Sequence, residues 1–138
     1  MEKVKRFGVS IEESLLKKFD SFIKSRKYKN RSEAIRDLIR ENFVSDSWED
    51  TDKFVAGAII MVYDHHKREL LDRLVGVQHD YQDIIISSQH IHLDHHNCME
   101  IIVVKGTMAK LIELESIMKA TKGVKHTTLA KSTLGDEI

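Results

Sequence analysis

The pattern of apolar and polar positions changes along the first part of the chain. Over residues 5–11 the two kinds alternate, which predicts a short strand with one apolar face formed by Phe7, Val9 and Ile11. From there to Phe43, apolar residues recur every three or four positions in two stripes, which predicts two amphipathic helices. This part of the chain is therefore expected to fold as strand–helix–helix.

Both predicted helices have a start signal. Ser10 stands three residues before Glu13, and Asn30 stands three residues before Glu33. In such a capping box the first side chain accepts a hydrogen bond from a backbone amide of the helix, and the glutamate bonds back. Helices are therefore expected to begin just after Ser10 and just after Asn30.

A polar, acidic segment at residues 45–53 interrupts the pattern and predicts a linker between two domains, 1–46 and 53–138. Residues 132–138 are expected to fray. The elements between follow from period-two and helical patterns. They are strand 54–63, helix 67–78, strand 81–93, a turn at 94–97, strand 98–105, helix 107–120 and strand 124–131. The order βαββαβ predicts a ferredoxin-like sheet with its helices on one face, so the fold class is α+β.

The net charge of zero hides an asymmetry along the chain. Residues 1–40 hold 12 Lys or Arg against 6 Asp or Glu, whereas the remainder holds 10 against 16. A basic amino-terminal part favours contact with nucleic acid. The single cysteine excludes an intrachain disulfide, and no apolar run of about 18 residues suggests a membrane span. The protein is expected to be cytoplasmic.

The predicted strand at residues 5–11 needs a partner for its backbone groups, and the neighbouring sequence offers none. The same strand of a second chain would complete an antiparallel ribbon, which fits the major groove of DNA. Arg6, Gly8 and Ser10 would then face the bases. The alternative is a strand that serves dimerisation alone.

A group of histidines around the only cysteine favours metal binding. His90 and His92 point to one face of a strand, about 7 Å apart along it. Cys98 begins the next strand across a tight turn, so a hairpin can bring its sulfur beside both rings. Imidazole and thiolate suit late first-row metals. The alternative is that these side chains are structural or solvated.

His79, at the end of the preceding helix, is a candidate fourth ligand. If the chain from His79 to His90 is extended, eleven steps of about 3.3 Å place the two roughly 30 Å apart. On that reasoning His79 would join the ligands of another subunit, and the metal would couple to assembly.

The remaining histidines are weaker candidates. Four near turns are expected to be solvated or at most low-affinity secondary metal sites: His65, His66, His95 and His96. His126, on the last strand, is expected to be packed or exposed without a function. Three imidazoles and one thiolate would fill a four-coordinate metal and leave no open position for a substrate, so the chain is not expected to be an enzyme.

The sequence resembles the nickel-responsive regulator family, NikR, over nearly its whole length. The resemblance rests on three stretches. They are Arg6-Phe7-Gly8-Val9-Ser10, Asn30-Arg31-Ser32-Glu33-Ala34-Ile35-Arg36-Asp37, and His79 followed by His90-x-His92-x5-Cys98. The third pattern is specific, whereas the first two are shared with other ribbon–helix–helix repressors.

The resemblance implies a ribbon–helix–helix dimer whose ACT-like carboxy-terminal domains join two dimers into a homotetramer. One Ni(II) per chain would be bound in a square plane by His90, His92 and Cys98 of one chain and His79 of another. Nickel-loaded protein would bind a palindromic operator in double-stranded DNA and repress nickel uptake.

Further roles implied by the resemblance fall on six positions. Lys67 and Arg68 would contact the DNA backbone, Glu33 and Asp37 would help bind a second, weaker cation, and Gln78 and Glu100 would support the nickel ligands. Many members of the family have Thr or Ser where this chain has Gly8, so the operator sequence does not follow. The alternative is a regulator of the same architecture that responds to another metal or to a small molecule.

Overall fold

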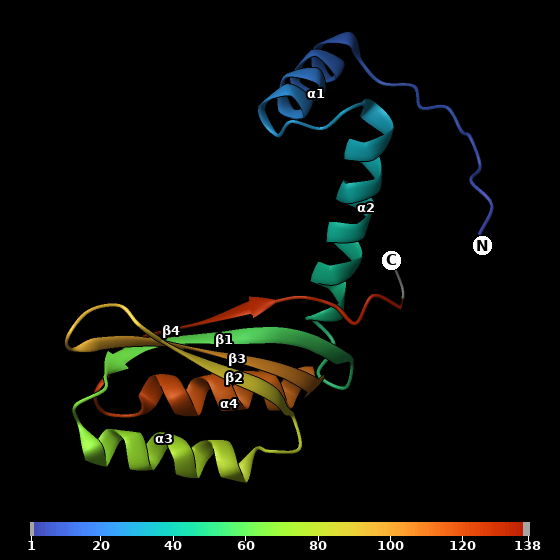
Figure 1. The fold of residues 1–138 in the computed structure, drawn as a ribbon. Helices are drawn as coiled ribbons and strands as arrows, with labels where there is room; N and C mark the ends of the chain where they lie inside the picture. The colour runs from blue at the N-terminus through green and yellow to red at the C-terminus, as the bar shows by residue number, and fades with distance from the viewer. Residues whose placement is uncertain (1, 137–138) are drawn as a thin grey trace. The chain divides into compact units, whose positions relative to one another are not determined.

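The computed structural model describes residues 2–136 and divides the chain into two compact units that meet between Glu41 and Asn42 (Figure 1). Each unit is described by itself. No helix in the described part has both the length and the apolar character that crossing a bilayer requires.

The amino-terminal unit contains helix α1, Glu13–Ser25, and the first part of helix α2, Arg31–Ser47. Residues 2–12 form no strand in the single chain, although a strand is expected at 5–11. Phe7 is 72% exposed and Val9 is 62% exposed, so the apolar face of this segment has no cover. A lone strand has no ladder to join, which is why the alternating pattern alone does not produce one here.

Only one of the two expected capping boxes forms. Helix α1 begins at Glu13 with Glu12 at the cap position and no side-chain cap, so the expected cap by Ser10 is wrong. At α2, Asn30 Oδ1 accepts a hydrogen bond from the Glu33 amide at 2.8 Å. Glu33 in turn accepts one from the Lys29 amide at 3.1 Å, so the second capping box is confirmed.

The carboxy-terminal unit is a four-stranded antiparallel sheet with α3 and α4 on one face (Figure 1). Its strand order is β2-β3-β1-β4. This is the βαββαβ arrangement expected from the sequence. The elements are β1 Phe54–Asp64, α3 Arg68–Asp80, β2 Ile85–His92, β3 Asn97–Thr107, α4 Met108–Ala120 and β4 Val124–Lys131.

Several boundaries differ from expectation by one or two residues, and two differ more. Helix α2 extends through Ser47, into the expected linker, and Trp48 after it is buried. The indole nitrogen of Trp48 donates a hydrogen bond to the Ser132 carbonyl at 2.8 Å. Strand β2 begins at Ile85 rather than at 81, because residues 81–84 form a turn.

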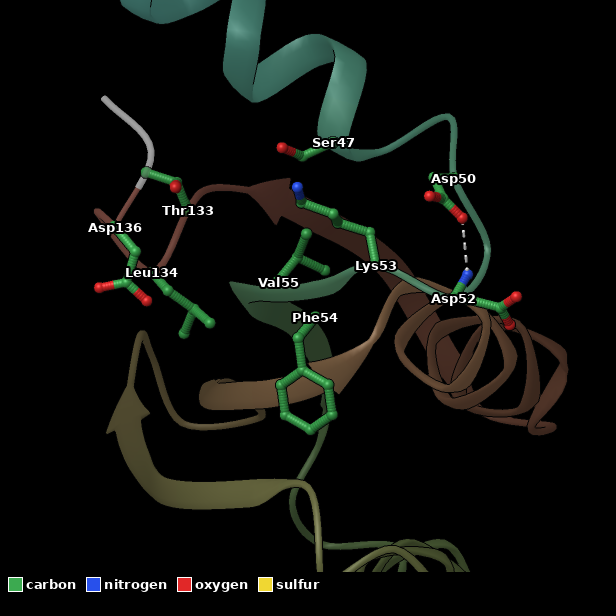
Figure 2. A pocket seen from close by; sticks show the side chains of 9 residues that line it. All are labelled: Ser47, Asp50, Asp52, Lys53, Phe54, Val55, Thr133, Leu134 and Asp136. Atoms are coloured by element: carbon green, nitrogen blue, oxygen red, sulfur yellow. Dashed lines mark hydrogen bonds between the residues drawn. The ribbon is translucent and has the colours of Figure 1, made fainter.

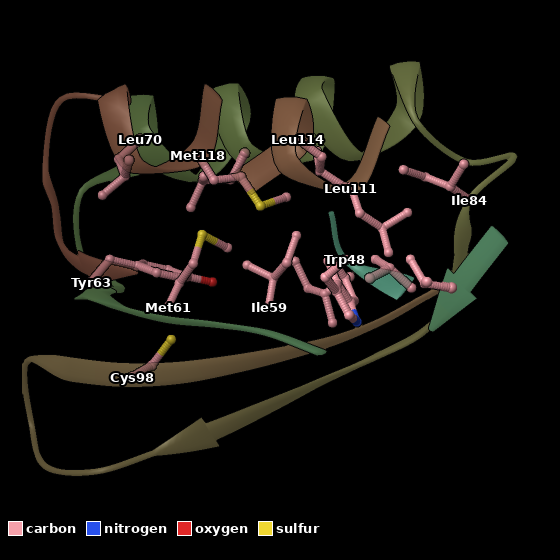
Figure 3. Close-up of a cluster of buried hydrophobic side chains, with 14 residues drawn as sticks. Trp48, Ile59, Met61, Tyr63, Leu70, Ile84, Cys98, Leu111, Leu114 and Met118 are labelled. Atoms are coloured by element: carbon pink, nitrogen blue, oxygen red, sulfur yellow. The ribbon is translucent and has the colours of Figure 1, made fainter. Parts of the chain in front are cut away.

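The core of this unit lies between the sheet and the two helices (Figure 3). Alternate residues of β1 point into it, including Ile59, Met61 and Tyr63, and they meet Leu114 and Met118 of α4. Since buried side chains fill the helix-covered face, side chains that share this face near its edge are held by a rigid support.

Candidate metal centre

The β2–β3 hairpin brings the predicted ligands together in the backbone register. His92 pairs with Cys98, and His90 pairs with Glu100. Directly opposed residues of an antiparallel pair point to the same face, so all four side chains share one face of the sheet. It is the face covered by the helices, because Cys98 and Glu100 pair on their other side with the core residues Tyr63 and Met61.

Cys98 lies in the buried part of this face, beside Tyr63 (Figure 3). Burial raises the pKa of the Tyr63 hydroxyl, and its hydrogen bonds with Glu100 and Cys98 raise it further. The phenol therefore stays protonated and acts as a donor at neutral pH. The thiol of Cys98 has a neutral hydrogen-bonding neighbour rather than a competing charge.

Glu100 is 1% exposed and is held by neighbours from two other elements. Tyr63 donates a hydrogen bond to Glu100 Oε1 at 2.7 Å, and the Gln78 side chain donates to Oε2 at 2.7 Å. The ring of His90 lies 3.5 Å from the same Oε2 and 3.3 Å from the Tyr63 hydroxyl. Since a buried carboxylate needs such partners, this network holds the Glu100 carboxylate in place beside the ring of His90.

The two imidazoles of β2 face different neighbours. His90 contacts Tyr63 and Glu100, whereas the ring of His92 lies 4.6 Å from the ring of His65. Within residues 2–136, the donor atoms of His90, His92 and Cys98 do not all lie within 4.8 Å of one another. The backbone therefore places the set on one face, and joint binding of one ion needs rotation of the imidazoles.

His79 is exposed in the last turn of α3, and it joins no three-donor group in the described part of the chain. The premise of an extended chain from His79 to His90 is wrong, because residues 81–84 form a turn, so the distance of roughly 30 Å does not follow. Gln78, the residue before His79, reaches the carboxylate opposite His90. The distance within one chain thus does not by itself assign His79 to another subunit.

A second group of donors lies where two turns meet. Atoms of Asp64, His66 and His96 lie within 4.8 Å of one another. The sequence patterns identified the two histidines only as weak candidates and did not identify Asp64. The pairing of β1 with β3 brings the end of β1 at Asp64 beside the turn that contains His95 and His96, and this pairing is not a local signal in the sequence.

The residues expected to meet DNA are accessible in the structure. Arg6, Gly8 and Ser10 are exposed in the segment before α1. Lys67 and Arg68 are exposed at the amino-terminal end of α3, where backbone amides also point outward.

The two carboxylates expected to bind a second cation already have partners. The Glu33 carboxylate accepts from the Lys29 amide, and Asp37 accepts a hydrogen bond from the Tyr28 hydroxyl. That hydrogen bond raises the pKa of Tyr28. A cation at this place would need oxygen lone pairs that these bonds leave free.

A pocket of about 370 Å³ lies beside the start of β1 (Figure 2). Its lining includes Asp50, Asp52 and Lys53 together with Phe54 and Leu134. None of the described residues that line it is a histidine or a cysteine, so its chemistry is unrelated to the candidate metal centre.

Comparison with known proteins agrees with both halves of this architecture. A family model described as "Ribbon-helix-helix protein, copG family" matches residues 5–42. A second, described as "NikR C terminal nickel binding domain", matches residues 56–132. The fold and the site thus define a DNA-binding regulator with a carboxy-terminal metal-binding domain.

Similar proteins match over nearly the full length of the chain. A protein of Syntrophus aciditrophicus is 53% identical over 135 residues, 98% of either chain. One of Nitratidesulfovibrio vulgaris is 51% identical over 138 residues, 100% of this chain and 99% of its own. One of Chlorobium limicola is 52% identical over 135 residues, 98% of this chain and all of its own. Each is named "Putative nickel-responsive regulator".

This chain belongs to the NikR family. The family is one of ribbon–helix–helix transcriptional regulators with a nickel-binding domain, not of enzymes, as expected from the sequence.

Proposed function

We propose that this chain is a nickel-dependent repressor, in which Ni(II) binding to the carboxy-terminal domain increases operator affinity and represses nickel uptake. The observation that carries the proposal is the pairing of His92 with Cys98, with His90 on the same face, in a chain of the NikR family.

His90, His92 and Cys98 of one chain and His79 of another would hold one Ni(II) per chain. The donors suit the ion, because imidazole and thiolate are ligands of late first-row metals. When bound, the metal supplies a cross-link between ligand-bearing segments. Glu100, held by Tyr63 and Gln78, would keep one nitrogen of His90 hydrogen-bonded and the ring correctly oriented.

The segment before α1 would pair with its copy in a second chain and form the DNA-reading ribbon. This would cover Phe7 and Val9 and would point Arg6 and Ser10 toward the bases, while Gly8 has no side chain to donate a hydrogen bond. Lys67 and Arg68 would bind phosphates. A protein that binds an operator must share a compartment with the DNA, so we propose that this protein acts in the cytoplasm.

The tetramer would use the sheet face opposite α3 and α4. Half-buried Ile60 and Val62 of β1 lie there beside Ile101 and the more exposed Val103 of β3. A second copy is a suitable cover for such an apolar surface. Glu33 and Asp37 would add a second, weaker cation site through their remaining lone pairs.

Metal binding and DNA binding would be linked because one arrangement of the chains favours both. To test this, an operator is first selected from random duplex DNA with the nickel-loaded protein. Operator affinity is then measured with and without Ni(II). In the parent we expect nickel to raise the affinity by about 5- to 150-fold.

The variants His92→Ala and Cys98→Ser should lose this response, whereas His95→Ala, an exposed neighbour in the same hairpin, should keep it. If both ligand variants respond to nickel like the parent, the proposed site is wrong. If nickel binds but never changes DNA affinity, the ligands stand and the regulatory link fails.

A further inference from the structure

Two turns at one edge of the carboxy-terminal sheet bring three metal-binding side chains together. Asp64 ends β1, and His66 follows it two residues later. His96 lies in the hairpin turn between β2 and β3, next to Asn97, which pairs with Asp64. One donor atom from each of Asp64, His66 and His96 lies within 4.8 Å of the other two.

Hydrogen bonds donated by backbone amides hold these turns in position before any ion binds. The His65 amide donates a hydrogen bond to the His96 carbonyl at 3.0 Å, which ties one turn to the other. Asp64 Oδ1 accepts from the His66 amide at 2.9 Å, and Asp94 Oδ1 accepts from the His96 amide at 2.8 Å. The arrangement of the donors therefore depends on the sheet pairing rather than on a single flexible loop.

We propose that Asp64, His66 and His96 form an auxiliary site for a late first-row divalent cation, such as Zn(II) or Ni(II). Two imidazoles and one carboxylate are ligands that such ions accept. The His66 side chain is 59% exposed, so water completes the coordination and the affinity is modest. The site shares no ligand with the set His79, His90, His92 and Cys98, and it does not depend on the proposed function.

A bound ion would cross-link the end of β1 to the hairpin turn. Lys67 and Arg68 follow His66 directly, so the ion would also hold the start of α3 in place. An adjoining open depression of about 460 Å³ is lined by His65, His66 and the hairpin, which gives an ion access from solvent.

The test uses the full chain, first given one equivalent of Ni(II) and then titrated with Zn(II) by calorimetry, with bound ions counted after dialysis. The parent should take up a further ion per chain. His66→Gln/His96→Gln should lose it, since glutamine keeps polarity but has no imidazole nitrogen. Asp64→Asn, which can still accept the His66 amide, should weaken it by at least about tenfold.

His95→Gln is the matched control, because this neighbouring histidine is outside the three-donor group, and it should bind like the parent. Retention of the further ion by the double variant at the parent's dissociation constant would overturn the proposal, as would its absence in the parent. Cys98→Ser should lose the first ion and keep the further one. If it keeps both, the nickel ligand assignment fails while the auxiliary site stands.

Discussion

At the scale of single residues, Glu100 decides how the candidate metal centre is held. It is the one acidic side chain that is buried among residues 2–136, and it lies opposite His90 in the sheet. A buried carboxylate without hydrogen-bond partners would be very unfavourable. Tyr63 and Gln78, which donate hydrogen bonds to Glu100, therefore belong to the site as well.

Replacing Glu100 with alanine should lower the free energy of unfolding by at least about 2 kcal/mol. The reason is that the Tyr63 hydroxyl and the Gln78 amide would lose their acceptor, at about 1–3 kcal/mol each. Urea unfolding of the metal-free protein measures the change. Glu69→Ala is the control, because that carboxylate is 83% exposed and should change stability by less than about 0.5 kcal/mol. Equal losses in the two variants would contradict a structural role for the buried network.

Asp94 gives a prediction about pH. The amide and side chain of Asn97, followed by the amide of His96, lower the pKa of Asp94 from 3.8 to about 2. Its ionised form therefore stabilises the folded state above the ordinary pKa, and this contribution disappears as the pH falls through about 2. The difference in unfolding free energy between the parent and Asp94→Asn should thus be smaller at pH 2.5 than at pH 6 in metal-free protein. Asp52→Asn, at an exposed linker position, is the control, and a pH-independent difference for Asp94→Asn would refute the assignment.

At the scale of elements, the sequence predicted what depends on local patterns. Strand β4 begins and ends as expected, at Val124 and Lys131, because alternation and the turn before it are local signals. The start of β2 was missed because Ile84 is buried under a turn, where its carbonyl accepts a hydrogen bond from the Lys105 amide. A run of apolar residues in the sequence does not show which of them belong to the hydrogen-bonded strand and which precede it.

The candidate metal ligands likewise include some whose grouping the sequence predicted and some whose grouping it did not. The spacing of His90, His92 and Cys98 was readable, because period two and one tight turn are enough to place them on one face. The grouping of Asp64 with His96 was not readable, since it depends on the register between β1 and β3. The register between two strands that are distant in sequence is set by the packing of the whole core. A short sequence motif does not contain that information.

The capping box at α2 gives a prediction at this scale. Asn30→Ala removes the acceptor of the Glu33 amide and should destabilise the amino-terminal unit by about 1 kcal/mol. Thermal melting of the full chain followed by helical circular dichroism measures the loss. Asn42→Ala, an exposed position inside the same helix, should be neutral or slightly stabilising, because alanine favours a helix interior. A loss at Asn42 equal to that at Asn30 would show that the cap does not matter.

At the scale of the whole molecule, two features are incomplete in one chain. The apolar side chains before α1 have no cover, and His79, His90, His92 and Cys98 do not form a group of metal donors in the described part of the chain. The charge is also segregated, with the excess of Lys and Arg in residues 1–40. Assembly of several chains would complete both features and would gather the basic parts on one DNA site.

The origin of His79 can be decided by mixing two inactive variants. His79→Ala lacks one proposed ligand and Cys98→Ser lacks another, so neither alone should bind Ni(II) with the parent's affinity. If His79 comes from another chain, unfolding and refolding the two together should restore complete sites wherever unlike chains meet. About a quarter of the parent's sites should return, because half of random pairings join unlike chains and each such pair has one complete set of ligands.

Nickel bound per chain after dialysis gives the count. Each variant refolded alone is the control, and recovery no greater than in these controls would mean that the ligands come from one chain.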